Sequence, residues 1–179
     1  MTPDPLFLAR SRFFDTLTIV AKEGGHLLYS LSRLGEEKID RSWVERLDHN
    51  AELAERLEAF ASRFGRMQDT MGEKLLPRWL EAQGEIPGSM IDVLRRAERF
   101  NIVEDAALWI GIRQRRNQLV HEYAEDSARF AEAIVTACRN VKVLITTYNR
   151  LRSYAMEHMS IAESELPPHL VGMPEQDHG

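Results

Sequence analysis

The segment from Trp109 to Tyr123 carries the residues whose types and spacing could do chemistry. Read as a helix that turns about 100° per residue, it places Arg113, Asn117 and His121 on one polar arc. Arg116 falls beside the apolar stripe of the same helix. An imidazole can accept or give a proton near neutral pH, and a guanidinium can hold two phosphate oxygens at once. The segment therefore offers the groups that proton transfer beside a phosphate requires.

Commoner explanations exist for each of these residues. A helix rich in arginine is often only a solvated face, and a single histidine beside apolar residues is often a satisfied core or surface residue. Tyr123 could be a helix-end tyrosine with a packed ring and a hydrated hydroxyl. The pattern of the segment thus permits a catalytic role without requiring one.

The charge distribution leaves room for a phosphate site although the net charge is -5. Residues 155–179 hold five acidic residues and no lysine or arginine, so residues 1–154 hold 23 charges of each sign. Around the motif, six arginines face only three acidic residues. These are Arg95, Arg96, Arg99, Arg113, Arg115 and Arg116, against Glu98, Glu104 and Asp105. The local excess of positive charge is suited to a polyanion.

Apolar residues at helical spacing predict the elements that must position the motif. A first helix is expected over about residues 6–33, with Phe7, Phe14 and Leu17 among its inward residues and a kink or an interruption at Gly24-Gly25. A turn follows at residues 34–37, with Asp40 or Ser42 as the next helix cap. The clearest helix spans residues 53–71, and Pro77 should end or kink it.

The second half of the chain is predicted to be helical as well. Residues 83–88 form a loop because of their glycines and proline, Ser89 caps a short helix, and the motif helix starts at Glu104 and Asp105. A last long helix is expected over residues 127–159. Strand patterns are absent from the sequence. We therefore predict an all-α antiparallel bundle of four long helices plus a short one over residues 1–160, followed by an acidic, flexible tail at residues 161–179.

The motif resembles that of the HepT toxins of the HEPN family. The resemblance is carried by Arg116-Asn117-x-x-x-His121-x-Tyr123 near the end of a helix in an all-helical protein of this size. It extends to residues 66–72, which read Arg-Met-Gln-Asp-Thr-Met-Gly, to Leu-Leu-Pro at residues 75–77, and to residues 93–104 before the motif helix. The similarity covers about residues 50–150 and makes the expected bundle one of the HEPN type.

The resemblance implies a metal-independent endoribonuclease that needs no cofactor and acts as a homodimer across a composite cleft. Within it, His121 would do general acid and base work, Arg116 would hold the phosphate, and Asn117 would orient one of these groups. Arg113 is a candidate auxiliary residue. Asp69 is a second candidate auxiliary residue by the same analogy, although a surface acid paired with arginine explains it nearly as well.

The resemblance also implies a partner protein. In this family an antitoxin of the MNT nucleotidyltransferase class transfers AMP to the tyrosine of the His-x-Tyr unit, which is Tyr123 here. The added phosphodiester would bring negative charge and bulk close to the catalytic histidine and so repel RNA. The sequence contains no nucleotidyltransferase motif of its own, so a separate protein would supply this activity.

Other functions remain open or are disfavoured by the sequence. The main alternative is a non-catalytic HEPN subunit that binds and assists a nucleotidyltransferase, and a weaker one is a bundle that only oligomerises. No zinc-ligand spacing is present, and the single cysteine, Cys138, is expected to be a small buried residue. No run of eighteen apolar residues and no secretory signal are visible, which favours a cytoplasmic protein without membrane contact.

Overall fold

The computed structural model describes residues 4–122 and 126–172, and the description excludes the side chains of residues 118 and 120–122. Among these residues every regular element is helical, which confirms the all-α class. The longest helices are α1 (Pro5–Leu34), α3 (Ala51–Thr70), α6 (Ala106–Glu122) and α7 (Ser127–His158). The shorter ones are α2 (Arg41–Glu45), α4 (Leu76–Glu81) and α5 (Met90–Arg99), with 3-10 turns at Leu47–His49 and Glu163–Glu165.

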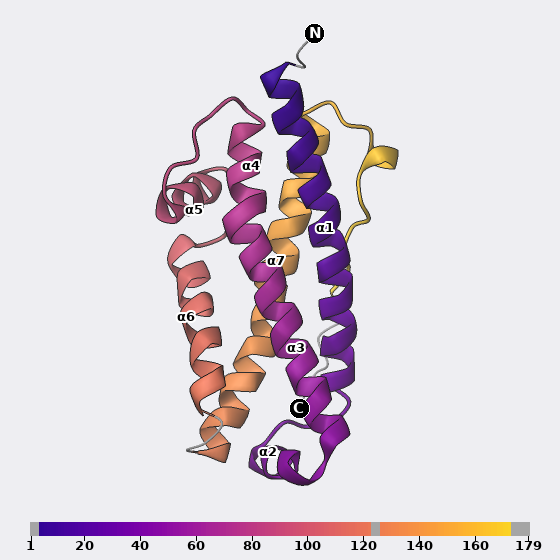
Figure 1. Ribbon diagram of the computed structural model, residues 1–179, viewed down its shortest axis with the longest axis vertical. Coiled ribbons are helices and arrows are strands. Elements are labelled where there is room, and N and C mark those ends of the chain that lie inside the picture. Colours follow the sequence, from indigo (N-terminus) through magenta and orange to yellow (C-terminus); the bar gives the residue numbers. More distant parts are fainter. Residues whose placement is uncertain (1–3, 123–125, 173–179) are drawn as a thin grey trace.

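The long helices run side by side along the length of the molecule (Figure 1). Helix α3 lies between α1 and α6, while α7 packs against α1, α6 and the short α2. Helix α5 contacts α4 and α6 at the other end of the bundle from α2. The core between the helices contains Trp43, Trp79 and Trp109, all nearly inaccessible to solvent.

Helices α3 and α4 form one continuous rod because a π-helical turn, Met71–Leu75, joins them. In this turn the Leu76 N–H donates to the carbonyl of Met71, five residues back. Pro77 then occupies the first turn of α4, where its missing N–H costs little. The wider turn thus accommodates the proline, and the rod continues past it. Of the two outcomes predicted for Pro77, an end of the helix or a kink, the first is therefore wrong.

Side-chain caps fix where several helices begin. Asp40 and Asn50 accept hydrogen bonds from the first turns of α2 and α3, and Ser89 forms a capping box with Asp92 at the start of α5. The predicted caps at Asp40 and Ser89 are therefore confirmed. Gly84 and Gly88 have φ values of 79° and 78°, which confirms the predicted loop between α4 and α5.

Two predictions about α1 are wrong. The helix continues without a break through Gly24-Gly25, since the rest of the bundle holds it on both sides of the pair. Phe7 is 65% exposed, whereas Phe13, Leu17 and Val20 are buried. The inward face is therefore rotated by roughly one residue from the predicted stripe at the N-terminal end of the helix.

The prediction of a flexible tail does not hold for residues 166–170, which belong to a segment that we call the C-terminal strap (residues 161–172). Leu166 and Leu170 are part of the buried core. The Tyr148 hydroxyl donates to the Pro168 carbonyl at 2.7 Å, and Arg152 Nε donates to the Pro167 carbonyl at 2.7 Å. These contacts attach the strap to α7, so the packed domain does not end at residue 160.

Gly24 provides the space in which the strap is seated. A Cβ atom at this position would lie 2.3 Å from Leu170 Cδ1, well inside van der Waals contact. At Gly25 a Cβ atom would meet nothing within 4 Å. The first glycine therefore has a packing role in a helix where glycine is otherwise unfavourable.

Helices in the described part of the chain contain no stretch long and apolar enough to cross a membrane.

Candidate functional site

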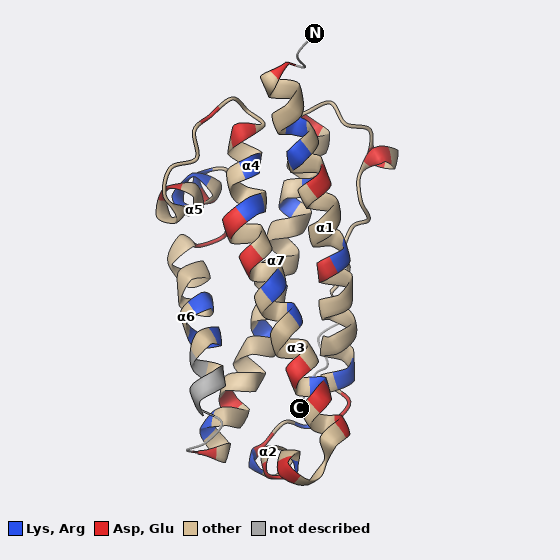
Figure 2. Cartoon of the chain, viewed as in Figure 1, with Lys and Arg blue, Asp and Glu red and all other residues tan. Residues whose placement is uncertain are grey.

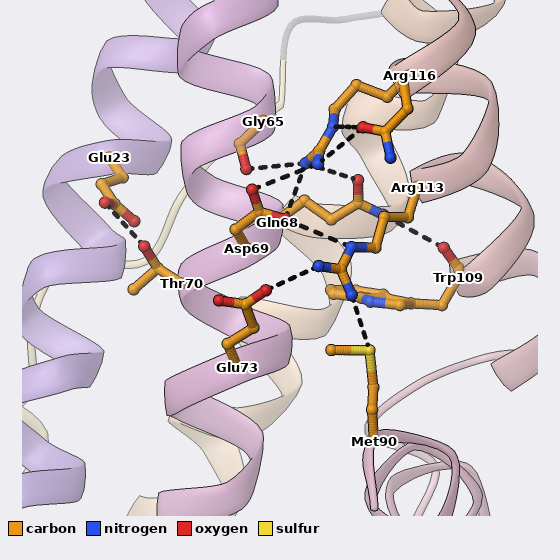
Figure 3. Close-up of polar contacts among 11 residues, drawn as sticks. Glu23, Gly65, Gln68, Asp69, Thr70, Glu73, Met90, Trp109, Arg113 and Arg116 are labelled. Atoms are coloured by element: carbon orange, nitrogen blue, oxygen red, sulfur yellow. Dashed lines mark hydrogen bonds and ion pairs between the residues drawn. The ribbon is translucent and has the colours of Figure 1, made fainter.

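Arg116 of the motif helix α6 forms an ion pair with Asp69 of α3 (Figure 3). Its Nη1 lies 3.0 Å from Asp69 Oδ1, and its Nη2 lies 3.3 Å from Asp69 Oδ2, so the two groups meet fork to fork. The Arg116 side chain is 15% exposed, and that of Asp69 is 40% exposed. The pair therefore lies at the edge of the α3–α6 contact, accessible to solvent from the carboxylate side.

Three further acceptors complete the surroundings of the Arg116 guanidinium. Nη1 also donates to the Gly65 carbonyl at 3.0 Å and to Gln68 Oε1 at 3.4 Å. Asn117 Oδ1 accepts from Nε at 3.4 Å and from Nη2 at 3.3 Å. Every nitrogen of the guanidinium thus has a partner inside the chain.

The side of α3 that faces α6 is shaped for close approach. Gly65, Gln68 and Gly72 follow one another at helical spacing on this side. A Cβ atom at Gly72 would lie 3.5 Å from the indole nitrogen of Trp109. Gln68 is 1% exposed, and its Nε2 donates to the Trp109 carbonyl at 3.2 Å. Small residues and one satisfied amide therefore allow α6 to pack closely on α3, which places Arg116 beside Asp69.

Arg113 lies one turn before Arg116 and reaches the same carboxylate. Its Nε is 3.6 Å from Asp69 Oδ1, its Nη2 is 2.7 Å from Glu73 Oε1, and its Nη1 is 3.2 Å from the sulfur of Met90. Glu73 belongs to the π-helical turn. The π-helical turn that accommodates Pro77 thus also supplies Glu73, the second acidic partner of Arg113.

The structure brings four of the predicted site residues together and does not describe the other two. Arg113, Arg116, Asn117 and Asp69 form one connected group. The backbone of His121 lies in the last turn of α6, but its side chain is outside the described residues. Tyr123 follows the end of α6 and lies wholly outside them. Three members of the group thus belong to the same helix as His121, α6, and precede it by four to eight residues.

Sequence reasoning missed Gln68, Glu73 and the Gly65 carbonyl as parts of this group. Gln68 could have been found, because it is a polar residue directly beside the apolar positions Phe64 and Met67 of α3. A buried amide needs hydrogen-bond partners, and the facing helix is where they are found. Glu73 gave no such signal, since its direction depends on the π-helical turn.

A second polar group lies on the other side of α3, facing α1. Glu23, His26, Arg63 and Arg66 line a hollow of about 180 Å³ there. Arg63 Nη1 donates to Ser30 Oγ at 2.7 Å, and the Thr70 hydroxyl donates to Glu23 Oε1 at 3.0 Å. Burial raises the pKa of Glu23 above its usual value, against the lowering by the Thr70 hydrogen bond and nearby cations. Arg66 is exposed and forms no hydrogen bond or ion pair with the described residues.

Arginine side chains of α3 and α6 lie near one another around the group that contains Arg116. No group of three or more histidine, cysteine, aspartate or glutamate side chains in the described ranges could hold a metal ion together. Arg113 and Arg116 stand next to each other on α6, and Arg66 stands on the neighbouring α3. A phosphate that approached Arg116 would compete with Asp69 and Asn117 for the same N–H groups.

Comparisons with models of known protein families, with curated proteins and with solved structures found no match.

Proposed function

We propose that this chain is the toxin of a HEPN/MNT toxin-antitoxin pair, a cytoplasmic, metal-independent endoribonuclease that acts as a homodimer of HEPN-type bundles. The observation that carries the proposal is the position of Arg116. Its guanidinium is held in place by Asp69, Gly65 and Asn117 at the solvent-accessible edge of the α3–α6 contact, five residues before His121 on α6. Phosphodiester cleavage without a metal needs a cation to hold the phosphate, the role proposed for Arg116, and a proton-transfer group, the role proposed for His121.

The reaction requires two proton transfers and one stabilised anion. One imidazole takes the proton from the 2'-hydroxyl of RNA, and O2' forms a bond to phosphorus. The bond from phosphorus to O5' then breaks, and a second imidazole gives its proton to O5'. The products are a 2',3'-cyclic phosphate and a free 5'-hydroxyl. His121 of each protomer would supply one of the two roles.

Arg116 would stabilise the charge that builds on the phosphate oxygens. Since its donors are already engaged, a phosphate must replace one existing acceptor, and the Asp69 carboxylate and the Asn117 amide oxygen are both accessible. Arg113 can then keep Asp69 in place, because it contacts the same carboxylate. Asn117 would orient the guanidinium, in keeping with its two contacts to Arg116.

The surrounding face is suited to a nucleic-acid backbone. Lysine and arginine positions, interspersed on α3 with acidic ones, occur on both α3 and α6 on the face turned to the viewer in Figure 2. Arg66 is exposed, so a phosphate can approach it, although its charge also acts on the nearby Glu23 carboxyl.

The critical test is cleavage of RNA by purified protein in the presence of EDTA. Because a general acid or base contributes about 10²- to 10⁴-fold in rate, His121→Ala should lower the cleavage rate by that factor. His49→Ala is the matched control, since His49 is an exposed histidine far along the chain from the motif. Equal cleavage by wild type and the His121 variant would remove the assignment.

The same proposal assigns regulation to Tyr123. An MNT-type nucleotidyltransferase partner with ATP and magnesium would transfer AMP to its hydroxyl and so stop cleavage by charge and bulk. Intact-mass spectrometry should show added AMP on the wild type and none on Tyr123→Phe, with Tyr29→Phe as the control at an exposed tyrosine. A phenylalanine ring has no hydroxyl to accept AMP, so modification of the Tyr123→Phe variant would place the acceptor elsewhere.

One observation favours a second candidate, the non-catalytic HEPN subunit that binds and assists a nucleotidyltransferase. All nitrogens of Arg116 have partners within the chain, as expected for a residue that only joins two helices. In that case the purified protein cleaves no RNA with or without His121, yet it forms a complex with the nucleotidyltransferase. Co-elution of the two proteins without any ribonuclease activity would favour this candidate.

A further inference from the structure

A hollow of about 390 Å³ lies at the α5 end of the bundle, away from the motif residues. One wall is the outer face of the C-terminal half of α7, and the other is the connection from α5 to α6 at residues 100–102. Its volume falls at the lower end of the range of about 300–1,000 Å³ found for small-molecule sites. The motif helix α6 ends beside the start of α7, and Arg150 lies about 35 Å along α7 from that start. The hollow is therefore well separated from the motif.

Some polar residues that line this hollow have partners, such as Asn149 with the Leu170 backbone and Glu157 with His158, and others do not. In the described part of the chain, Arg150, Ser153 and the side chain of Asn101 form no hydrogen bond or ion pair. Asn101 has a φ of 55°, a left-handed conformation that turns the chain at this wall. Arg150 is half-buried. Side-chain donors that line one hollow without a protein partner are available to a ligand.

Aromatic rings form the rest of the wall. Phe100 is 50% exposed and is supported from beneath by edge contacts to Trp79 at 5.5 Å and to Tyr154 at 6.2 Å between ring centroids. The Tyr154 ring also contacts the His158 ring at 4.4 Å. A ring held rigidly at the surface by other rings is a platform on which a planar ligand can stack.

The side chains that α7 contributes to the hollow differ in chemistry from one end of the hollow to the other. Arg150, Tyr154 and His158 are spaced four apart, so they share one face of the helix. The helical rise places Arg150 about 6 Å from Tyr154 and about 12 Å from His158. Arg150 therefore lies at one end of the row. Tyr154, against which Phe100 packs, follows it, and His158 with its neighbour Glu157 lies at the other end, so that the phosphate would bind at the Arg150 end and the base beside Phe100.

We propose that this hollow is a binding site for a nucleoside monophosphate, with the base on Phe100 and the phosphate on Arg150. Purines are the preferred bases because their larger rings stack more strongly. A single free arginine suits one phosphate group, held by two N–H donors. Asn101 and Ser153 supply hydrogen bonds to the sugar and the base edge. The site is independent of the proposed ribonuclease activity.

Isothermal titration of the full chain with guanosine monophosphate, guanosine and inorganic phosphate tests the proposal. The nucleotide should bind more tightly than either part. Arg150→Gln should weaken nucleotide binding about tenfold or more and leave guanosine binding unchanged, because it removes only the charged contact. Phe100→Leu should weaken both the nucleotide and the nucleoside.

Arg139→Gln is the matched control, since Arg139 is an exposed arginine of α7 outside the hollow. Circular dichroism would establish that each variant keeps its helices. Absence of nucleotide binding at millimolar concentration overturns the proposal. Binding that Arg150→Gln and Arg139→Gln weaken equally would also overturn it, because the phosphate would then be bound by general charge.

Discussion

Asp69 joins α3 to the motif helix α6 through two arginines. It accepts from Arg116 and lies close to Arg113, and the first of these is nearly buried. Removing one member of a buried pair leaves the other charge poorly solvated, whereas an exposed pair contributes little. Asp69 lies between these cases, so the contact should contribute measurably to stability whatever the motif does in catalysis.

We predict that Asp69→Ala lowers the free energy of unfolding by about 1–2 kcal/mol, measured by urea denaturation. Glu58→Ala is the matched control on the same helix, because Glu58 is exposed and forms no ion pair with the described residues. It should change stability by less than about 0.5 kcal/mol. A similar loss in both variants would mean that Asp69 is only a surface acid.

Tyr148 provides a prediction about pH. Burial raises its pKa from 10.0 to about 12, although nearby Arg152 lowers it in part, and its hydroxyl donates to the strap. The folded state therefore favours the neutral phenol. Its contribution to stability is complete below about pH 10 and is lost as the pH rises toward 12, with a slope of up to about 1.4 kcal/mol per pH unit.

Tyr148→Phe removes both the hydrogen bond and this titration. At about pH 8 the variant should be less stable than the wild type by about 1 kcal/mol, and above about pH 10 the difference should shrink. Urea denaturation at several pH values measures this. A difference that stays constant over the range would show that Tyr148 ionises equally in both states.

Two helix starts were predicted correctly because the signals for them are local, although the short helix α2 itself was not predicted. Asp40 and Ser89 cap the helices that follow them, because a side chain that accepts from the first turn acts within a few residues. The π-helical turn was not predictable, since it depends on where Pro77 must lie against the core. The exposure of Phe7 was missed for a related reason: the rotation of α1 is decided by its neighbours.

The candidate site was predictable to a similar degree. The grouping of Arg113, Arg116 and Asn117 follows from spacing along one helix, and Asp69 came from the resemblance. The roles of Gln68 and Glu73 depend on how α3 and α6 pack, which no local pattern encodes. The strap was missed because a short apolar segment between prolines and acidic residues resembles a tail unless the groove that receives it is known.

The two adjacent glycines of α1, Gly24 and Gly25, allow a direct test of how the strap packs against this helix. Gly24→Leu would place a side chain where Leu170 now packs, so the strap should be displaced, with lower stability and faster cleavage of residues 161–172 by proteinase K. Gly25→Leu meets open space and replaces a glycine within a helix, which should stabilise the protein by about 0.5–1 kcal/mol.

Opposite effects at neighbouring positions of one helix would be hard to explain by helix propensity alone. Should both variants resist proteinase K like the wild type, the strap would not depend on the space above Gly24. Mass spectrometry of the fragments identifies where cleavage begins.

The molecule as a whole offers one His121 per chain, whereas the proposed reaction needs a base and an acid at the same time. Mixed dimers test whether two chains share one cleft. When wild type is mixed with an excess of His121→Ala and allowed to exchange subunits, nearly every wild-type chain is paired with a variant chain. If both imidazoles serve one phosphodiester, ribonuclease activity per wild-type chain should fall toward that of the variant, by about 10²-fold or more.

The matched mixture contains His49→Ala in the same excess and should retain full activity, since that exposed histidine is outside the motif. Activity that stays proportional to the wild-type chains would mean that each protomer works alone. It would then remove the composite cleft from the proposal while leaving cleavage itself in place. The experiment thus separates the arrangement of the two chains from the identity of the catalytic group.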